Sequence, residues 1–295
     1  MRVLITGATG WIGHGLVSAL SQAGHDLVII SRSPEQAREQ IGFRVLALDW
    51  KSPLPSVDAV IHLAGEPVVN KRWSKKRKEI LERSRVDQTA HLVQSIKAMK
   101  GEKPRRFLSA SAIGYYGNRE NEILNESSPA GEGFLADLCQ NWEKQAREAE
   151  NLGIETCCVR IGVVLGSGGG ALAKIQPLFK MGLGGRLGSG RQWMSWVHYQ
   201  DLIQLFLWLL ETPQLPKVVN GTAPGAVTNL EFTKTLSGVL GRPAFFAVPG
   251  FVLRFALGEL SSALLEGQRV SPEALLKQGF TFRYSELKRA LTEAT

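Results

Sequence analysis

The sequence predicts an α/β protein built on a doubly wound parallel sheet, with a smaller C-terminal substrate lobe. Short apolar runs alternate with longer segments of helical periodicity in the first half of the chain. The runs are apolar almost throughout, as expected of parallel strands that are buried on both faces. A glycine-rich turn follows the first run and opens the first helical segment. Together these features indicate right-handed βαβ units covered by helices on both sides.

Six runs are predicted to be strands of the sheet, and two segments between them show the clearest helical spacing. The helical segments run from Ile12 to Ala23 and from Ile80 to Ile96. The predicted strands are Val3–Thr6, Leu27–Ile30, Val45–Leu48, Ala59–Leu63, Phe107–Ser109 and Thr156–Arg160.

The character of the sequence changes beyond about residue 162, where ten glycines fall within 29 residues. We therefore assign residues 1–165 to a dinucleotide-binding domain, which later segments can rejoin, and residues 166–295 to a smaller cap lobe. Helical patterns return in this lobe at 201–211, 229–240, 251–265 and 272–278. No clean linker separates the lobes, so we expect them to share a cleft.

Composition excludes several classes of protein. The chain has 295 residues, 44% of them hydrophobic, which is typical of a globular protein and not of a disordered one. No apolar run approaches the roughly 20 residues that a membrane-spanning helix needs, and we expect no membrane partner. The three cysteines suggest neither a disulfide framework nor a metal site. A cytoplasmic location is expected.

The strongest motif is the segment Gly7-Ala8-Thr9-Gly10-Trp11-Ile12-Gly13. Its first glycine permits a tight turn, its second lets the backbone approach a pyrophosphate, and its third lets the helix pack close to the sheet. A diphosphate would then lie at the helix N-terminus, where free N–H groups and the positive end of the helix dipole meet it. This context predicts a Rossmann-type nucleotide site that includes Thr9, Trp11 and Ile12.

The end of the second strand indicates which dinucleotide binds. Enzymes that use NAD normally place an acidic residue there for the ribose 2′-hydroxyl, whereas this chain has Ser31-Arg32-Ser33. Asp26 lies at the other end of the same strand. A guanidinium group binds phosphate through parallel, charged hydrogen bonds, so the sequence predicts NADP(H). The alternative is that Arg32 only caps a surface turn.

Five further segments follow the glycine loop in a characteristic order. They are Leu63-Ala64-Gly65, Ser109-Ala110-Ser111, Tyr115-Tyr116-Gly117, Arg160–Gly166, and Leu264–Val270 with Gly279–Phe282. With these segments the sequence resembles the extended short-chain dehydrogenase/reductases, the superfamily of the sugar-nucleotide epimerases. More closely it resembles their atypical "epimerase family" subgroup, whose C-terminal extension would begin near residue 243.

The resemblance implies further cofactor contacts. Ser31 and Arg32 would hold the adenosine 2′-phosphate, and Arg85 would contact the cofactor from the following helix. Five residues at the carboxyl ends of strands would line the cofactor. They are Leu63 and Ala64 with Gly65, Ser109, and Val164 on the nicotinamide side.

The catalytic pair of the superfamily, a tyrosine followed four residues later by a lysine, is missing from its usual helix, and Tyr284 with Lys288 matches the spacing only in the C-terminal extension. The helix where it belongs reads from Phe134 to Glu143 and contains neither residue. Ser111 and Tyr116 are the candidate proton donors, since both lie just beyond the fifth strand. The alternative is that both hydroxyls only bind substrate or backbone.

Two functions therefore remain open. The first is an oxidoreductase or epimerase that transfers hydride on a small carbonyl or nucleotide-sugar substrate. The second is a catalytically silent sensor that binds NADP(H) and signals through a protein partner. The net charge of +8 and the basic segment Lys71–Lys78 do not by themselves predict nucleic-acid binding, because no known binding motif accompanies them. A homodimer is compatible with the sequence.

Overall fold

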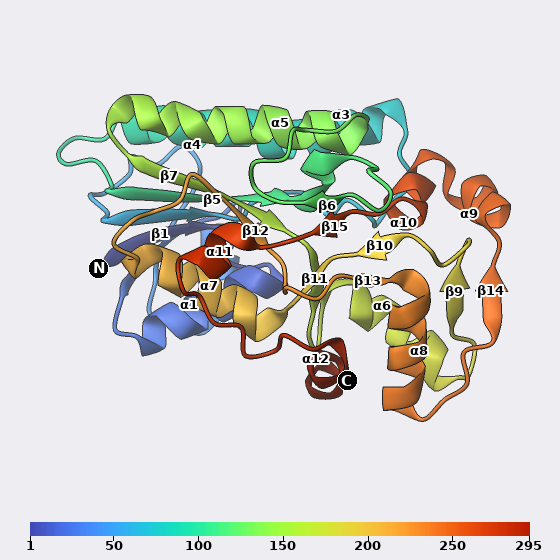
Figure 1. Cartoon of the computed structure of the whole chain (residues 1–295). Coiled ribbons are helices and arrows are strands. Elements are labelled where there is room, and N and C mark those ends of the chain that lie inside the picture. The colour runs from blue at the N-terminus through green and yellow to red at the C-terminus, as the bar shows by residue number, and fades with distance from the viewer.

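The central element is a seven-stranded, fully parallel sheet in a computed structural model that describes residues 1–295 (Figure 1). The order of its strands is β12-β7-β5-β4-β1-β2-β3. Their bounds are Arg2–Thr6 for β1, Asp26–Ile30 for β2, Leu46–Leu48 for β3, Ala59–His62 for β4, Arg106–Ala112 for β5, Glu155–Ile161 for β7 and Val218–Gly221 for β12. All six strands predicted from the sequence are present. The strand order runs outward from β1 in both directions, as in a doubly wound sheet.

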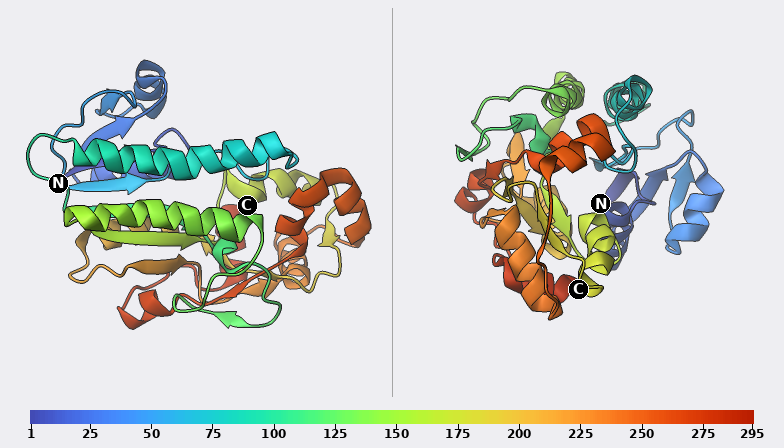
Figure 2. Two further views of the ribbon diagram at one scale, coloured as in Figure 1. Left: turned by 90° about the horizontal axis from the view of Figure 1, so that it is seen from above. Right: turned by 90° about the vertical axis from the view of Figure 1, so that its right-hand side faces the viewer.

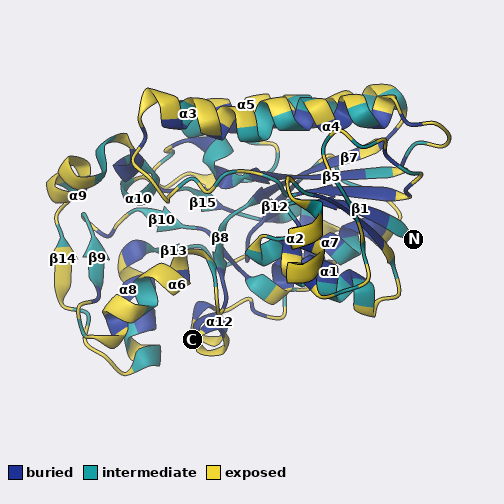
Figure 3. Ribbon diagram, turned by 180° about the vertical axis from the view of Figure 1, so that it is seen from behind, coloured by how far each residue is buried: buried dark blue, intermediate teal, exposed yellow.

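Helices cover both faces of this sheet. The helices of one face are α1 (Trp11–Gln22), α2 (Pro34–Ile41) and α7 (Tyr199–Glu211). The other face carries α3 (Lys75–Glu82), a π-helix (Arg83–Asp87), α4 (Gln88–Lys97) and α5 (Phe134–Arg147). Figure 2 shows α4 and α5 lying side by side over the strands. Figure 3 shows buried strands between helices whose outer faces are exposed, which accounts for the uniformly apolar strand sequences.

The second lobe is built from short strands and helices around its own core. Its helices are α6 (Gly170–Lys180), α8 (Asn229–Leu240) and α12 (Leu287–Ala294), which pack around the fully buried Trp196. Four small two-stranded sheets complete the fold, and two of them pair a strand from residues 1–165 with a strand of the second lobe. They pair β8 (Val163–Leu165) with β11 (Trp196–His198), β10 (Trp193–Met194) with β13 (Val227–Thr228), β9 (Gly185–Leu187) with β14 (Phe246–Val248), and β6 (Ile123–Leu124) with β15 (Arg269–Val270).

One predicted helix is wrong in its extent. Residues 251–265 do not form a single helix but α9 (Gly250–Leu257), a 3₁₀ turn (Gly258–Ser261) and α10 (Ser262–Leu265). The break lies at Gly258, whose φ of 60° is open to glycine and strained for other residues. The other three helical patterns of the second half correspond to α7, α8 and α11 (Glu273–Lys277). No helix of the protein is both long enough and apolar enough to cross a membrane.

The basic segment Lys71–Lys78 lies against this broken helix. Lys78 forms an ion pair with Glu259, and the Arg72 guanidinium donates to the Phe255 carbonyl at 3.5 Å. Trp73 is buried and packs near Leu260 in a small apolar cluster. Part of the segment therefore joins the C-terminal extension to the dinucleotide-binding domain.

Candidate functional site

The glycine loop between β1 and α1 has the close contacts that its sequence predicted. Gly7 has a φ of +74°, and a Cβ there would lie 2.8 Å from the Leu63 carbonyl carbon. A Cβ on Gly13 would lie 2.1 Å from the Gly7 carbonyl oxygen. Glycine is required at both positions because any side chain would push the turn away from β4 or α1 away from the turn.

The N-terminus of α1 is open toward this loop. Its N-cap residue is Gly10, no side chain caps the helix, and no acidic residue lies in the first turn. The free N–H groups and the helix dipole therefore face the loop without an internal anion. Thr9 and Gly10 are not buried, so this cradle fits a cofactor diphosphate.

The side chains of the predicted loop do not all face the cofactor cradle. The Trp11 ring stacks on Tyr199 with a centroid distance of 4.6 Å. A Cβ added to Gly169 would meet the Trp11 ring at 2.2 Å, and one on Gly170 would lie 2.8 Å from the Val164 carbonyl oxygen. Trp11 therefore fixes the glycine-rich segment after β8 against the diphosphate loop and brings Val164 to the same region.

Arg32 extends into solvent just past β2. Its side chain is 84% exposed, and its Nη1 lies 3.9 Å from Oε1 of Glu66, which follows β4. The neighbouring Ser31 hydroxyl accepts a hydrogen bond from the Ser33 amide at 3.2 Å. With this exposure the Arg32 guanidinium can turn toward a phosphate beside the loop, and the contact with a 2′-phosphate stays a prediction.

A buried hydrogen-bond chain fixes the end of β4. The Thr6 hydroxyl accepts from the Ala64 amide at 3.3 Å and donates to Nδ1 of His62 at 2.6 Å. His62 Nε2 donates at 2.9 Å to the Thr89 hydroxyl, whose own proton goes to the Arg85 carbonyl. Burial and then the Arg85 charge lower the pKa of His62 to about 3, so the ring is neutral. The histidine is a structural link and holds Leu63 and Ala64 beside the diphosphate loop.

Arg85 enters the site from the π-helix between α3 and α4. A π-turn widens the helix locally and often marks a functional position. The guanidinium donates to the Glu66 carbonyl at 2.9 Å and lies 5.2 Å from the ring centre of Trp142. A Cβ on Gly65 would lie 3.2 Å from it. Burial lowers the pKa of Arg85, yet its hydrogen-bond acceptors are uncharged oxygens.

A cavity of about 1560 Å³ opens at the carboxyl ends of β5 and β7. On the side of the dinucleotide-binding domain the cavity is lined by Arg85, the Ala110–Gly114 segment and one face of α5. On the other side it is lined by most of the residues between Gly258 and Leu265 in the broken helix. Ligands of open α/β sheets bind beyond the carboxyl ends of the strands. The cavity therefore adjoins the predicted nicotinamide side of the cofactor site and is the candidate substrate site.

Ser111 lines this cavity, but its hydroxyl is already bonded. It donates to Oε1 of Glu143 at 2.7 Å, and the same carboxylate accepts from Arg160 Nε at 2.8 Å and Nη2 at 2.9 Å. Burial opposes the charge on Arg160, but the hydrogen bonds that its guanidinium donates to Glu143 raise its pKa overall. In this arrangement Ser111 can offer a substrate its oxygen lone pairs but has no free proton.

Tyr116 lies behind the cavity wall and is fully buried. Its hydroxyl donates to Asn220 Oδ1 at 2.7 Å and accepts from Arg160 Nη1 at 3.0 Å. Burial raises the pKa of Tyr116, the opposite of what proton exchange near neutral pH requires. These contacts correspond to the alternative in which the hydroxyl binds protein groups, and they hold η2 (Ile113–Tyr116) against β7 and β12.

Leu135 and Cys139 of α5 face Gly114, just past the end of β5, and are four residues apart like the missing pair. A Cβ on Gly114 would lie 3.2 Å from Leu135 and 3.9 Å from the Cys139 sulfur. Leucine has no proton to donate, and burial together with the Glu143 charge raises the pKa of Cys139 to about 11. The structure thus contains no tyrosine–lysine substitute on this helix.

Ser109 is buried on β5, and its hydroxyl donates to the Ala110 carbonyl at 3.1 Å. It supports the sheet beneath the cavity.

The sequence analysis did not single out Trp142 and Glu143, which lie on the inner face of α5. Trp142 is buried, and its Nε1 has no hydrogen-bond partner. A signal was available for Glu143, a charged residue in helical register with the apolar Ala136, Cys139 and Ala146.

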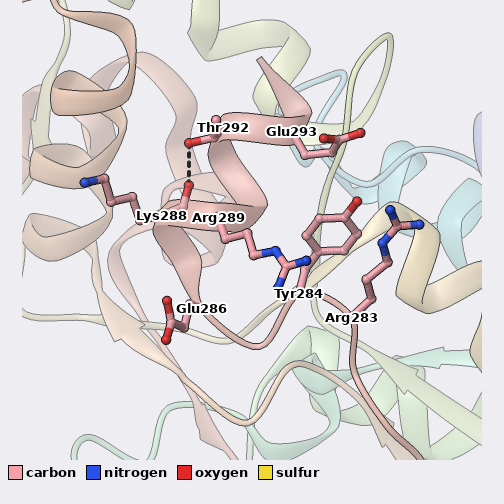
Figure 4. A pocket seen from close by; sticks show the side chains of 7 residues that line it. All are labelled: Arg283, Tyr284, Glu286, Lys288, Arg289, Thr292 and Glu293. Atoms are coloured by element: carbon pink, nitrogen blue, oxygen red, sulfur yellow. Dashed lines mark hydrogen bonds between the residues drawn. The ribbon is translucent and has the colours of Figure 1, made fainter.

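A second hollow of about 370 Å³ is lined by residues of the C-terminal helix and of the segment just before it (Figure 4). Tyr284 stands between Arg283 and Arg289, whose guanidinium carbons lie 5.4 and 5.6 Å from its ring centre. The amides of Arg283 and Tyr284 donate to the Asp201 carboxylate at 2.9 Å. These contacts attach the extension to α7, and none of the predicted site residues lies in this hollow.

Comparison with known proteins assigns the chain to a family. The model of the NAD dependent epimerase/dehydratase family matches residues 3–220. The chain belongs to this family. A second family model, a domain of unknown function, matches residues 248–294, the region that carries α9, α10 and α12.

Relatives of the same subgroup match along the whole chain. An Arabidopsis thaliana protein named epimerase family protein SDR39U1 homolog, chloroplastic, is 41% identical over 99% of this chain and 86% of its own length. The Homo sapiens epimerase family protein SDR39U1 is 37% identical over 99% of both chains. The crystal structure of the human protein with NADPH superposes with a TM-score of 0.91 at 35% identity, over 100% of this chain and 99% of the other.

Proposed function

We propose that this family member binds NADP(H) and uses it as an oxidoreductase or epimerase on a small carbonyl or nucleotide-sugar substrate. Three features support the cofactor: the glycine cradle, the uncapped N-terminus of α1, and Arg32 in place of an acidic residue at the end of β2. The human relative solved with NADPH agrees with this choice. When bound, the cofactor supplies or removes a hydride at a carbon of the substrate.

The observation that carries the enzymatic part is the cavity beside the predicted nicotinamide position. It is large enough for a small molecule next to the cofactor, because ligand pockets typically measure about 300–1,000 Å³ and this one is about 1560 Å³. Arg85 lines it and has no carboxylate bonded to its guanidinium. A positive group at this position would stabilise negative charge on a substrate oxygen during hydride transfer, with water supplying the proton.

The test is a turnover screen of carbonyl compounds and nucleotide sugars, followed by reduced-nicotinamide absorbance and by product stereochemistry. Wild-type protein should turn over at least one compound with NADPH. The same reaction should slow in an Arg32→Asp variant, because the cofactor would bind weakly. A substrate that the Arg32→Asp variant turns over with NADPH as fast as the wild type does would contradict the NADP(H) assignment.

The bonding of the site residues favours a second candidate function, a silent sensor of the NADP(H) redox state. Ser111 and Tyr116 both donate their protons to protein groups, and Leu135 and Cys139 occupy the helix where a catalytic pair belongs. Tight NADPH binding without turnover across a broad screen, together with a partner protein that distinguishes NADPH-bound from NADP⁺-bound protein, would support the sensor over the enzyme.

A further inference from the structure

We propose that Glu66 sets the preference of this site between phosphorylated and unphosphorylated dinucleotides by competing with the cofactor 2′-phosphate for Arg32. The inference rests on the NADP(H)-binding part of the proposed function and adds to it a residue that tunes selectivity. Glu66 precedes Pro67 in the connection that follows β4. In the structure its carboxylate is the acidic group nearest to Arg32, at 3.9 Å between Oε1 and Nη1.

The topology of the sheet brings this carboxylate to the adenosine side. Strand β1 lies between β2 and β4, so the segments that follow β2 and β4 flank the diphosphate loop. Arg32 follows β2 and Glu66 follows β4. A nucleotide site with no acidic residue at the end of β2 thus acquires one from a neighbouring connection.

Glu66 cannot easily leave when a phosphate arrives. Its amide donates to the Ser84 hydroxyl at 3.1 Å, and its carbonyl accepts from Arg85 at 2.9 Å. Its Oε2 lies 3.4 Å from Nη1 of Arg77, whose side chain is only 9% exposed. Both the main chain and the carboxylate of Glu66 are therefore held by groups other than Arg32.

The charge of Glu66 weakens the binding of a cofactor that carries a 2′-phosphate. Arg32 is 84% exposed and can turn toward a phosphate, whereas Glu66 stays in place because Arg77 still holds its other carboxylate oxygen, Oε2, at 3.4 Å. The fixed carboxylate then competes for the guanidinium and repels the phosphate. This interaction lies within the screening length of about 10 Å at 0.1 M salt. A cofactor without the 2′-phosphate experiences neither effect. Glu66 therefore reduces the difference in binding affinity between NADPH and NADH.

The variant that isolates the charge is Glu66→Gln, because glutamine keeps an oxygen that can accept from Arg77. Glu39→Gln is the matched control, since Glu39 is exposed on α2 and has no ion pair. Dissociation constants for NADPH, NADH, adenosine 2′,5′-bisphosphate and AMP would be measured by calorimetry at low and high salt. These measurements require no turnover.

Glu66→Gln should bind NADPH and the bisphosphate about three- to tenfold more tightly at low salt, and less so at high salt. NADH and AMP should change less than twofold, and Glu39→Gln should match the wild type. An unchanged ratio of NADPH to NADH affinity would overturn the inference, as would weaker NADPH binding, which would mean that Glu66 orients Arg32 productively. Failure of the wild type to bind any dinucleotide would instead refute the proposed function, and this inference with it.

Discussion

Glu143→Gln should destabilise the protein far more than the loss of an ordinary ion pair. The Glu143 and Arg160 side chains are only 5% and 3% exposed, and their atoms meet at 2.8 Å. Glu143 accepts three hydrogen bonds, two from Arg160 and one from Ser111. Glutamine would leave the buried Arg160 charge without its counterion and would turn an N–H₂ group toward donors.

The magnitude follows from burial. Removing one partner of a buried ion pair costs about 3–5 kcal/mol, because the remaining charge stays desolvated. The matched control is Glu155→Gln, which removes the partner of Arg106 at a site where the carboxylate is 56% exposed. A pair of that exposure contributes about 1 kcal/mol or less. Arg106 also keeps its bonds to the carbonyls of Leu209 and Thr212.

The assay is urea unfolding followed by tryptophan fluorescence, at neutral pH and fixed salt. Replacing both partners by apolar residues, Glu143→Leu with Arg160→Met, should recover part of the loss because no unpaired charge remains. If Glu143→Gln lowers the free energy of unfolding no more than Glu155→Gln does, the reasoning about burial is refuted.

Three further predictions concern the cofactor site and the link beneath it. Arg32→Asp should weaken NADPH binding by about 10- to 100-fold and NADH binding much less; fluorescence titration of both would show it, and equal losses would contradict the 2′-phosphate contact. Gly13→Ala should lower the melting temperature and cost at least about tenfold in NADPH affinity, because its Cβ would lie 2.1 Å from the Gly7 oxygen. Gly238→Ala, with no atom within 4 Å of its Cβ, should be neutral or stabilising. Because the pKa of His62 is about 3 in the folded protein and ordinarily about 6.5, the unfolded state takes up a proton below about pH 6.5 that the folded state does not bind. The stability difference between wild type and His62→Asn should therefore shift against the wild type by at most about 1.4 kcal/mol per pH unit as the pH falls from about 6.5 toward about 3. Urea midpoints at neutral and acidic pH would measure it, and a pH-independent difference would contradict a neutral buried ring.

The sequence was sufficient for the fold and for the cofactor cradle because both depend on local pattern. The apolar strand runs, such as Val3–Thr6, and the helical spacing of Ile12–Ala23 are visible without any tertiary contact. Gly7 and Gly13 are recognisable because they stand at fixed offsets between a strand and a helix. The helix over 251–265 was mispredicted because Gly258, inside an apolar pattern, adopts a left-handed φ.

The chemistry of the cavity could not be predicted in the same way. Ser111 and Tyr116 looked equivalent in sequence, yet one lines the cavity and the other is buried behind it. Which proton each hydroxyl donates depends on Glu143 and Asn220, which lie 32 and 104 residues away along the chain. The role of Arg85 likewise depends on a π-turn that its local sequence did not reveal.

The sequence by itself determined the doubly wound sheet, the diphosphate loop and the preference for an arginine over an acid at the end of β2. Tertiary structure decided what surrounds them: Glu66 beside Arg32, Arg85 beside Trp142, and part of the basic segment against the C-terminal extension. The physical reason is the distance along the chain over which each property is set. Backbone conformation and strand burial follow from neighbouring residues, whereas the charge and proton affinity of a side chain are set by groups that only the folded chain brings within a few ångströms of it.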